Sequence, residues 1–327
     1  MVESTIRKQL EIPEYYNHHD FSEVLTIYEL LDQPSKPGSI LVSLYRELGV
    51  KNIVLKKVSG EKGSTEFLKM LIPGKKGKSQ GDRAPTLGVI GRLGGVGARP
   101  DVIGFVSDGD GALTALSTAL RLAKMHKNGD ILNGDIIIAT HVCTNAPTMP
   151  HDPVPFMGSP VDLATMNKYE VTAEMDAILS IDTSRGNLII NQSGFAISPT
   201  VKEGYILKMS DDLLAIMQQT TAKLPVTFPI SIQDITPYGN GLYHFNSILQ
   251  PATATNAPVV GVAITGEVPV AGCTTGVTNP QQIDSVGRFI IEVAQRFGKG
   301  TCKFYDEKEF HIIIKKYGNL HKFQELR

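Results

Sequence analysis

The chain has 327 residues, 42% of them hydrophobic, and a formal net charge of −1. A chain of this length can bury a large core, and its near-neutral charge offers no basic face for nucleic acid or for an anionic membrane. The first twenty residues are charged and contain no apolar run, so they do not resemble a secretion signal. Three cysteines without close spacing predict no disulfide framework, and we expect a cytoplasmic protein.

Apolar periodicity predicts two helices near the start of the chain, one over residues 24–31 and one over 39–48 that ends at Gly49. Two strands are expected next, at 52–58 and 67–72. From residue 86 onward, short apolar runs alternate with helical periodicity. Strands are expected at 86–91, 102–106, 135–140, 176–182, 187–191, 226–233 and 258–264, and helices at 111–126, 160–172, 210–223 and 280–297.

This alternation predicts an α/β fold in which a mixed, mostly parallel sheet lies between two layers of helices. No Pro/Gly-rich linker divides the sequence, so we expect residues 1–327 to form a single domain.

Polar residues follow several of the expected strands. Asp108 and Asp110 alternate with glycines before an expected helix, which favours a cation or an amine as ligand, or else a capping role for Asp110. His141 and Cys143 lie two residues apart just past a strand, so both can face one side as ligand, base or nucleophile. The alternative is that both are packed in the core.

The segment from Met149 to Pro155 contains three prolines, which predicts a stiff, extended loop. Such a loop presents His151 and Asp152 at little entropic cost, so both are candidate site residues. The alternative is a purely structural loop.

Residues 87–124, with Asp108 just before a helix, and the later strand that ends in Asp182 resemble the metal-binding core of the co-catalytic zinc exopeptidases. The resemblance implies a three-layer α/β/α fold of that type. It also shows departures. Arg92 occupies the position of the first histidine ligand, residues 140–145 contain no acid where a Glu pair is usual, and the terminal histidine falls near Cys273.

At most two of the usual ligands therefore remain, and we do not expect a conventional two-metal site. The cofactor is then either none or a divalent metal such as zinc, held by Asp108, Asp182 and His151. A rearranged single-metal site is the alternative, drawn from His141, Cys143, His151, Asp152 and Asp182. Arg92 and Asp152 are expected to bind substrate, with Arg92 acting as a carboxylate clamp.

Two further resemblances rest on short segments of the sequence. Residues 149–158 resemble a bacterial and archaeal family of unknown function, which implies no activity. The Gly272-Cys273-Thr274 segment and residues 103–114 resemble motifs of the cofactor-independent amino-acid racemases, with Cys143 as the first thiol. Racemase chemistry requires two thiols of lowered pKa on opposite faces of a Cα.

The leading hypothesis is a hydrolase acting on a small peptide, amide or amino-acid derivative. Its catalytic candidates are Asp108, Asp110, His141, Cys143, His151, Asp182 and Cys273. The alternatives are a non-catalytic binding or assembly protein on a degenerate peptidase scaffold and a racemase-like isomerase. We expect Asp108, His141, Asp182 and Cys273 to share one edge of the sheet, Arg92 to pair with Asp108 or Asp182, and the chain to form a homo-oligomer.

Overall fold

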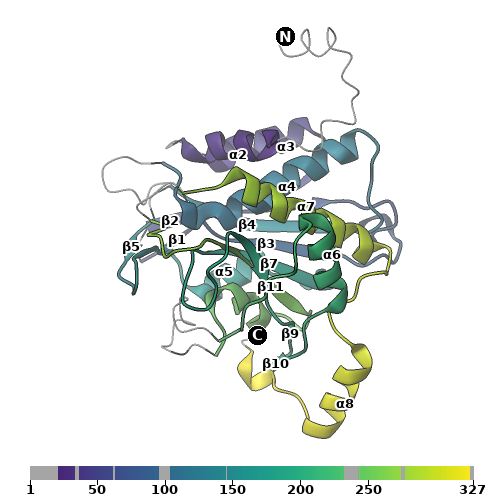
Figure 1. The fold of residues 1–327 in the computed structure, drawn as a ribbon. Coiled ribbons are helices and arrows are strands. Elements are labelled where there is room, and N and C mark those ends of the chain that lie inside the picture. The colour runs from purple at the N-terminus through teal and green to yellow at the C-terminus, as the bar shows by residue number, and fades with distance from the viewer. Residues whose placement is uncertain are drawn as a thin grey trace.

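A mixed nine-stranded sheet forms the middle of the protein in the computed structural model (Figure 1). The structure describes residues 21–33, 37–61, 63–95, 104–144, 146–231, 242, 244–273 and 277–324. The strand order is β1-β2-β4-β3-β7-β11-β9-β10, and β8 pairs with β11 beside this path.

Parallel strands occupy the centre of the sheet, and antiparallel strands extend it on both sides. The parallel strands are β4 (Ile136–Cys143), β3 (Leu87–Gly95), β7 (Ala177–Ser184) and β11 (Val259–Thr265). The antiparallel strands are β1 (Asn52–Gly60), β2 (Gly63–Ile72), β8 (Gly194–Ile197), β9 (Val201–Lys202) and β10 (Tyr205–Ile206). A separate hairpin joins β5 (Thr148–Met149) to β6 (Phe156–Met157).

Helices cover both faces of the sheet. On one face α4 (Asp110–Lys127) and α7 (Pro280–Gly298) pack side by side, with α2 (Ser22–Asp32) and α3 (Pro37–Glu47) outside them and α6 (Asp211–Thr221) against α7. The other face carries α5 (Leu163–Glu170) and the 3-10 helix η4 (Ser247–Thr253). The short helices η2 (Lys78–Gln80), η3 (Ser107–Gly109) and η5 (His321–Phe323) lie in connections.

The strands divide their side chains between two hydrophobic clusters, one on each face. Along β7, Leu179 and Ile181 join the cluster beneath α4 and α7, whereas Ile178 joins the cluster beneath η4. This alternation follows from the two-residue period of a strand. It explains why the central strands are apolar at nearly every position, and the predicted α/β class with a mixed sheet between helices is confirmed.

The helices expected at 111–126, 160–172, 210–223 and 280–297 are confirmed, although α5 is shorter than expected. The strand expected at 187–191 is wrong. These residues form a loop in which the Asn187 side chain accepts from the backbone of Ile189 and Ile190, and Leu188 is 96% exposed. The strand instead begins at Gly194.

Two other expected strands are not strands where the structure describes them. Residues 104–106 contain only an isolated bridge residue, Phe105, and residues 102–103 lie outside the described ranges. Residues 226–231 contribute one bridge, between Thr227 and Ile197, and residues 232–233 again lie outside the description.

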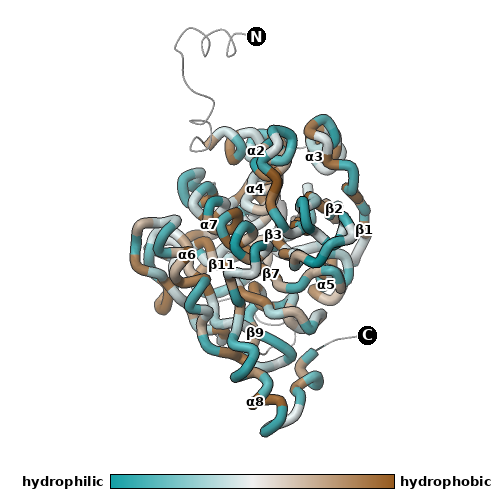
Figure 2. Tube along the Cα trace, turned by 90° about the vertical axis from the view of Figure 1, so that its right-hand side faces the viewer, coloured by the Kyte–Doolittle hydropathy of each residue, from teal (hydrophilic) through white to brown (hydrophobic). Residues whose placement is uncertain are grey.

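The last helix, α8 (Glu307–Tyr317), was not expected and has no buried residue. It lies at the opposite end of the molecule from α2 and α3 (Figure 2). Within the described ranges, no helix is long and apolar enough to cross a membrane.

Candidate functional site

Two cavities lie at opposite ends of the central strands. The smaller, about 80 Å³, lies at the carboxyl end of β7, and its lining includes Asp108, Asp182, Arg185 and His151. The larger, about 670 Å³, lies at the amino ends of β7 and β11. We place the candidate active site in the smaller cavity because acid–base groups meet there, and because open α/β sheets bind their substrates at the carboxyl ends of the strands.

Asp108 reaches this cavity from η3, just before α4. Its Oδ2 accepts from the Met157 backbone N–H at 2.6 Å, and Gly272 packs directly against its carboxylate. Burial raises the pKa of Asp108 to about 6, although the Met157 hydrogen bond and the positive charge of Arg185 oppose that rise. The carboxyl group therefore titrates close to neutral pH.

Asp182 reaches the same cavity near the end of β7. Its Oδ1 accepts from the Thr183 backbone N–H at 2.8 Å. Burial, opposed by the Thr183 hydrogen bond and supported by the negative charge of Asp108, raises the pKa of Asp182 to about 7. Two carboxyl groups that influence each other titrate as a pair, so one of them holds a proton near neutral pH.

Arg185 is a site residue that our sequence interpretation missed. It lies just past β7 and forms an ion pair with the fully buried Asp110, whose other oxygen accepts from Thr278 Oγ1 at 2.6 Å. Burial lowers the pKa of Arg185 to about 10, and the charge of Asp108 opposes that shift. The alternative that Asp110 caps α4 is wrong, since the N-cap is Gly109 and no side chain caps this helix end. Asp110 instead anchors Arg185.

Arg92 lies beneath the site, on the η4 face of the sheet. Its guanidinium donates to Glu170 Oε2 at 2.8 Å and to Asn167 Oδ1 at 2.7 Å, and His141 Nδ1 lies 2.6 Å from Glu170 Oε1. The expected partner was wrong: the hydrogen-bonded carboxylate is Glu170 rather than Asp108 or Asp182. The side chains of Arg92 and Glu170 are 2% and 1% exposed. Because this side chain is buried and both of its terminal nitrogens bond residues of α5, it is closed to a substrate carboxylate.

The charge of Arg92 nevertheless reaches the site, because it favours the ionised form of Asp182 and so lowers the pKa of that carboxyl. Arg92, His141 and Asp182 share this face because each follows the two-residue period of its strand. No local sequence pattern identifies Glu170 as their partner, because Glu170 lies in α5, 29 residues after His141 in the chain.

Cys143 and Cys273 lie together in a small apolar cluster with Val106, Ala146 and Met157. Burial, followed by the negative charge of Asp108, raises the pKa of the Cys273 thiol. The structure thus brings the two predicted cysteines together, but packed in an apolar cluster rather than facing each other across a cavity.

His151 lines the small cavity and packs edge-on against Phe156, with ring centroids 5.4 Å apart. Asp152 is exposed and is not among the described residues that line the cavity. Of the two residues predicted on the proline-rich loop, the structure therefore brings only His151 to the site.

A family model described as "Protein of unknown function (DUF1177)" matches residues 56–327. The chain belongs to the DUF1177 family. No curated protein matches the chain. All the residues named above as site candidates lie inside the DUF1177 match, and the likeness to zinc exopeptidases remains a resemblance.

The candidate ligands in the described part of this DUF1177 protein are not arranged as a metal site. Within the described part of the chain, no three His, Cys, Asp or Glu side chains are grouped so that they could hold an ion. The predicted set of Asp108, Asp182 and His151 is brought to one cavity without forming such a group. In addition, the backbone N–H groups of Met157 and Thr183 already bond one oxygen of Asp108 and of Asp182.

Proposed function

We propose that this DUF1177 protein is a hydrolase of small peptides, amides or amino-acid derivatives, in which the Asp108–Asp182 pair activates water. One observation carries the proposal: two carboxyl groups, the partly buried Asp108 and the buried Asp182, line one cavity with pKa values of about 6 and about 7. Pairs of acids held in different protonation states are a recurring device for acid–base catalysis at neutral pH.

In this mechanism the ionised Asp108 takes a proton from a water molecule as the water oxygen bonds to the amide carbon. The protonated Asp182 gives its proton to the carbonyl oxygen, which yields a neutral tetrahedral intermediate. Asp108 then protonates the leaving nitrogen as the C–N bond breaks, and Asp182 recovers a proton from a hydroxyl of the intermediate. The products are a carboxylic acid and an amine, and both aspartates return to their starting states.

Arg185 supports this division of roles. Its positive charge favours the ionised form of Asp108, whereas burial and the charge of Asp108 favour the protonated form of Asp182. Asp110 holds the guanidinium in place through a buried ion pair. The small cavity volume of about 80 Å³ suits a single amide group rather than a long substrate.

The two alternatives have less support. A racemase needs thiols of lowered pKa, whereas the pKa of Cys273 is raised. A binding scaffold without chemistry needs no pair of acids with shifted pKa values in one cavity, and such shifts cluster at functional sites.

The test is hydrolysis of a panel of dipeptides, N-acyl amino acids and primary amides by the wild-type protein and three variants. We expect Asp108→Asn and Asp182→Asn each to lower kcat/KM by at least about 100-fold, as loss of a general acid or base does. The matched control Asp152→Asn, which removes an exposed carboxylate, is expected to retain wild-type activity.

We further expect a bell-shaped pH profile centred between about 6 and about 7, and activity that survives a chelator. Absence of hydrolysis across the panel would contradict the proposal. So would equal losses in Asp152→Asn and Asp182→Asn.

A further inference from the structure

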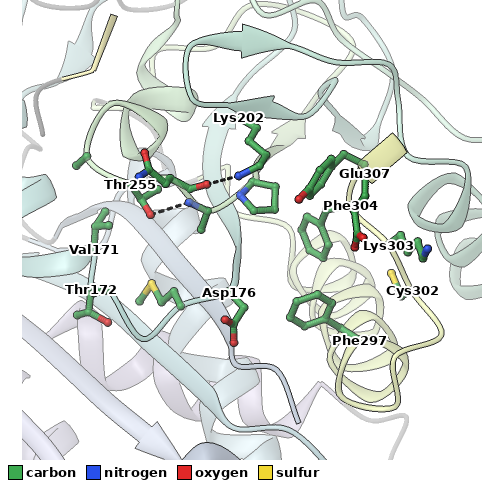
Figure 3. Close-up of a pocket in the computed structure, with 17 residues that line it drawn as sticks. Val171, Thr172, Asp176, Lys202, Thr255, Phe297, Cys302, Lys303, Phe304 and Glu307 are labelled. Atoms are coloured by element: carbon green, nitrogen blue, oxygen red, sulfur yellow. Dashed lines mark hydrogen bonds between the residues drawn. The ribbon is translucent and has the colours of Figure 1, made fainter. Parts of the chain in front are cut away.

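The large cavity at the amino ends of β7 and β11 has no role in the proposed hydrolysis. Its volume of about 670 Å³ falls within the usual range of small-molecule sites. One wall comes from residues just before the two strands, including Met175, Asp176 and Pro258. Figure 3 labels Asp176 on this wall. The other comes from the end of α7 and the segment leading into α8. The cavity therefore lies at the opposite end of β7 from Asp182.

Aromatic rings form much of the second wall. Phe297 and Phe304 meet edge to face, with ring centroids 5.3 Å apart, and Tyr305 lies beside them on the lining. Figure 3 shows Phe297 and Phe304 together on this side, across from Val171 and Thr172. A flat apolar ligand would gain both buried area and ring–ring contacts at such a wall.

Lys202 provides a cation at the edge of the same cavity. Its ammonium donates to Glu203 Oε1 at 2.7 Å and to the Asn256 backbone carbonyl at 2.6 Å, and it lies 5.4 Å from the centroid of the Tyr305 ring. An ammonium carries three N–H donors, and these two bonds use two of them. The side chain is 11% exposed and lines the cavity, and its ammonium also lies 4.9 Å from the centroid of the Phe310 ring.

The acidic residues around the cavity are largely balanced. Asp176 pairs with Lys78 Nζ at 2.6 Å and accepts from the Thr86 backbone N–H at 2.8 Å. Glu203 pairs with Lys202, and the one further acid on the lining, Glu307, is exposed to solvent. A ligand carboxylate would therefore meet no unpaired buried acid.

We propose that this cavity binds a small aromatic carboxylate, with its ring against Phe297 and Phe304 and its carboxylate on the Lys202 ammonium. A charge-assisted hydrogen bond would hold the carboxylate of the ligand, and ring–ring contacts would hold its aromatic ring. The site is separate from the Asp108–Asp182 pair, so it does not depend on the proposed hydrolysis.

The chain contains no Trp, which makes an indole probe convenient. Indole-3-propionate, excited where Tyr absorbs weakly, reports its own binding by a change in fluorescence. We expect a Kd on the order of 0.1 mM, which corresponds to a modest ligand efficiency for a molecule of this size. The uncharged indole-3-propionamide is expected to bind about tenfold more weakly, because it loses the charge-assisted bond.

Variants locate the site. Lys202→Met should remove the preference for the acid over the amide, whereas Lys202→Arg and the exposed control Lys56→Met should keep it. Ala257→Phe, which fills the cavity from its lining, should weaken both probes at least about tenfold. Asp182→Asn should bind both probes like the wild type.

Equal affinity of the wild-type protein for the two probes would overturn the proposal, as would no fluorescence change at millimolar probe. A wild-type preference for the acid in a folded Lys202→Met variant would also overturn it. If Lys202→Met does not fold, Ala257→Phe decides the location. Hydrolysis plays no part in these measurements, so their failure and that of the proposed function are distinguishable.

Discussion

Gly272 lets the connection after β11 pass directly over the Asp108 carboxylate. Its backbone carbonyl lies 3.4 Å from Asp108 N, and a Cβ at this position would collide with the carboxylate of Asp108. Any residue other than glycine would displace that carboxyl group. The position of a proposed catalytic group therefore depends on the absence of a Cβ at residue 272.

We expect Gly272→Ala to displace Asp108 and to lower hydrolytic activity by at least about tenfold, at a stability cost of about 1–3 kcal/mol typical of overpacking. Activity assays and thermal unfolding measure the two effects. Gly266→Ala is the matched control, because its added Cβ would meet its nearest atom at 3.9 Å. Wild-type activity in Gly272→Ala would show that the contact does not position Asp108.

The residue scale also shows where the sequence interpretation was incomplete. The resemblance to zinc exopeptidases and the ends of expected strands both point to Asp108 and Asp182, and both residues line one cavity. Arg92 was recognised as unusual, but its partner Glu170 lies 78 residues away in the chain. A pairing over that separation depends on how α5 docks on the sheet, which no local pattern specifies.

At the scale of single elements, α8 is held by contacts at both ends and by Phe310, whose ring lies 5.6 Å from that of Tyr305 and 6.4 Å from that of Tyr205. It has no buried residue, so a large apolar face does not hold it. Asp306 caps its start by accepting from the backbone N–H groups of Lys308 at 2.8 Å and Glu309 at 3.2 Å. Tyr205 Oη donates to the Gly318 carbonyl just past its end, at 2.7 Å.

We expect Asp306→Ala to destabilise α8 by about 1 kcal/mol, the usual cost of losing an N-cap side chain. Amide hydrogen exchange over residues 307–317 should then accelerate about fivefold. Exchange in α6, which has its own cap at Ser210, is the internal control and should not change. Unchanged exchange in α8 would mean that contacts other than the cap hold this helix.

Other elements show why some expectations failed. Leu188, Ile189 and Ile190 form an apolar run that predicts a strand, yet Leu188 and Ile189 are exposed. The Asn187 side chain accepts hydrogen bonds from the backbone N–H groups of Ile189 and Ile190 and so forms a turn. These N–H groups are then not available for pairing with a neighbouring strand. Helices α4 and α7 were predicted well because their long amphipathic patterns carry more information than a three-residue run.

At the scale of the whole molecule, the buried acids link folding to pH. The pKa values of Asp108 and Asp182 rise from 3.8 to about 6 and about 7 in the folded state. The folded protein therefore binds protons more tightly than the unfolded chain between pH about 4 and about 7. Stability from these groups is fully present below pH 3.8 and is lost as pH rises through the folded pKa values.

We expect Asp182→Asn to make the free energy of unfolding depend less on pH over this window, by a total on the order of a few kcal/mol. At pH 8 the variant should be more stable than the wild type, since it no longer carries a buried charge there. Denaturant unfolding at several pH values measures this, with Asp152→Asn as an exposed control. Parallel curves for the wild type and Asp182→Asn would contradict the shifted pKa.

Local periodicity in the sequence predicts the α/β class and most of the main helices and strands. Asp108 and Asp182 became candidates through the resemblance to zinc exopeptidases and through the rule that ligands bind where parallel strands end. Only the tertiary structure decided that Arg185 pairs with Asp110, that Glu170 joins Arg92 to His141, and that Cys143 packs beside Cys273. Such contacts join segments far apart in the chain, so they depend on how helices and loops dock rather than on any local pattern.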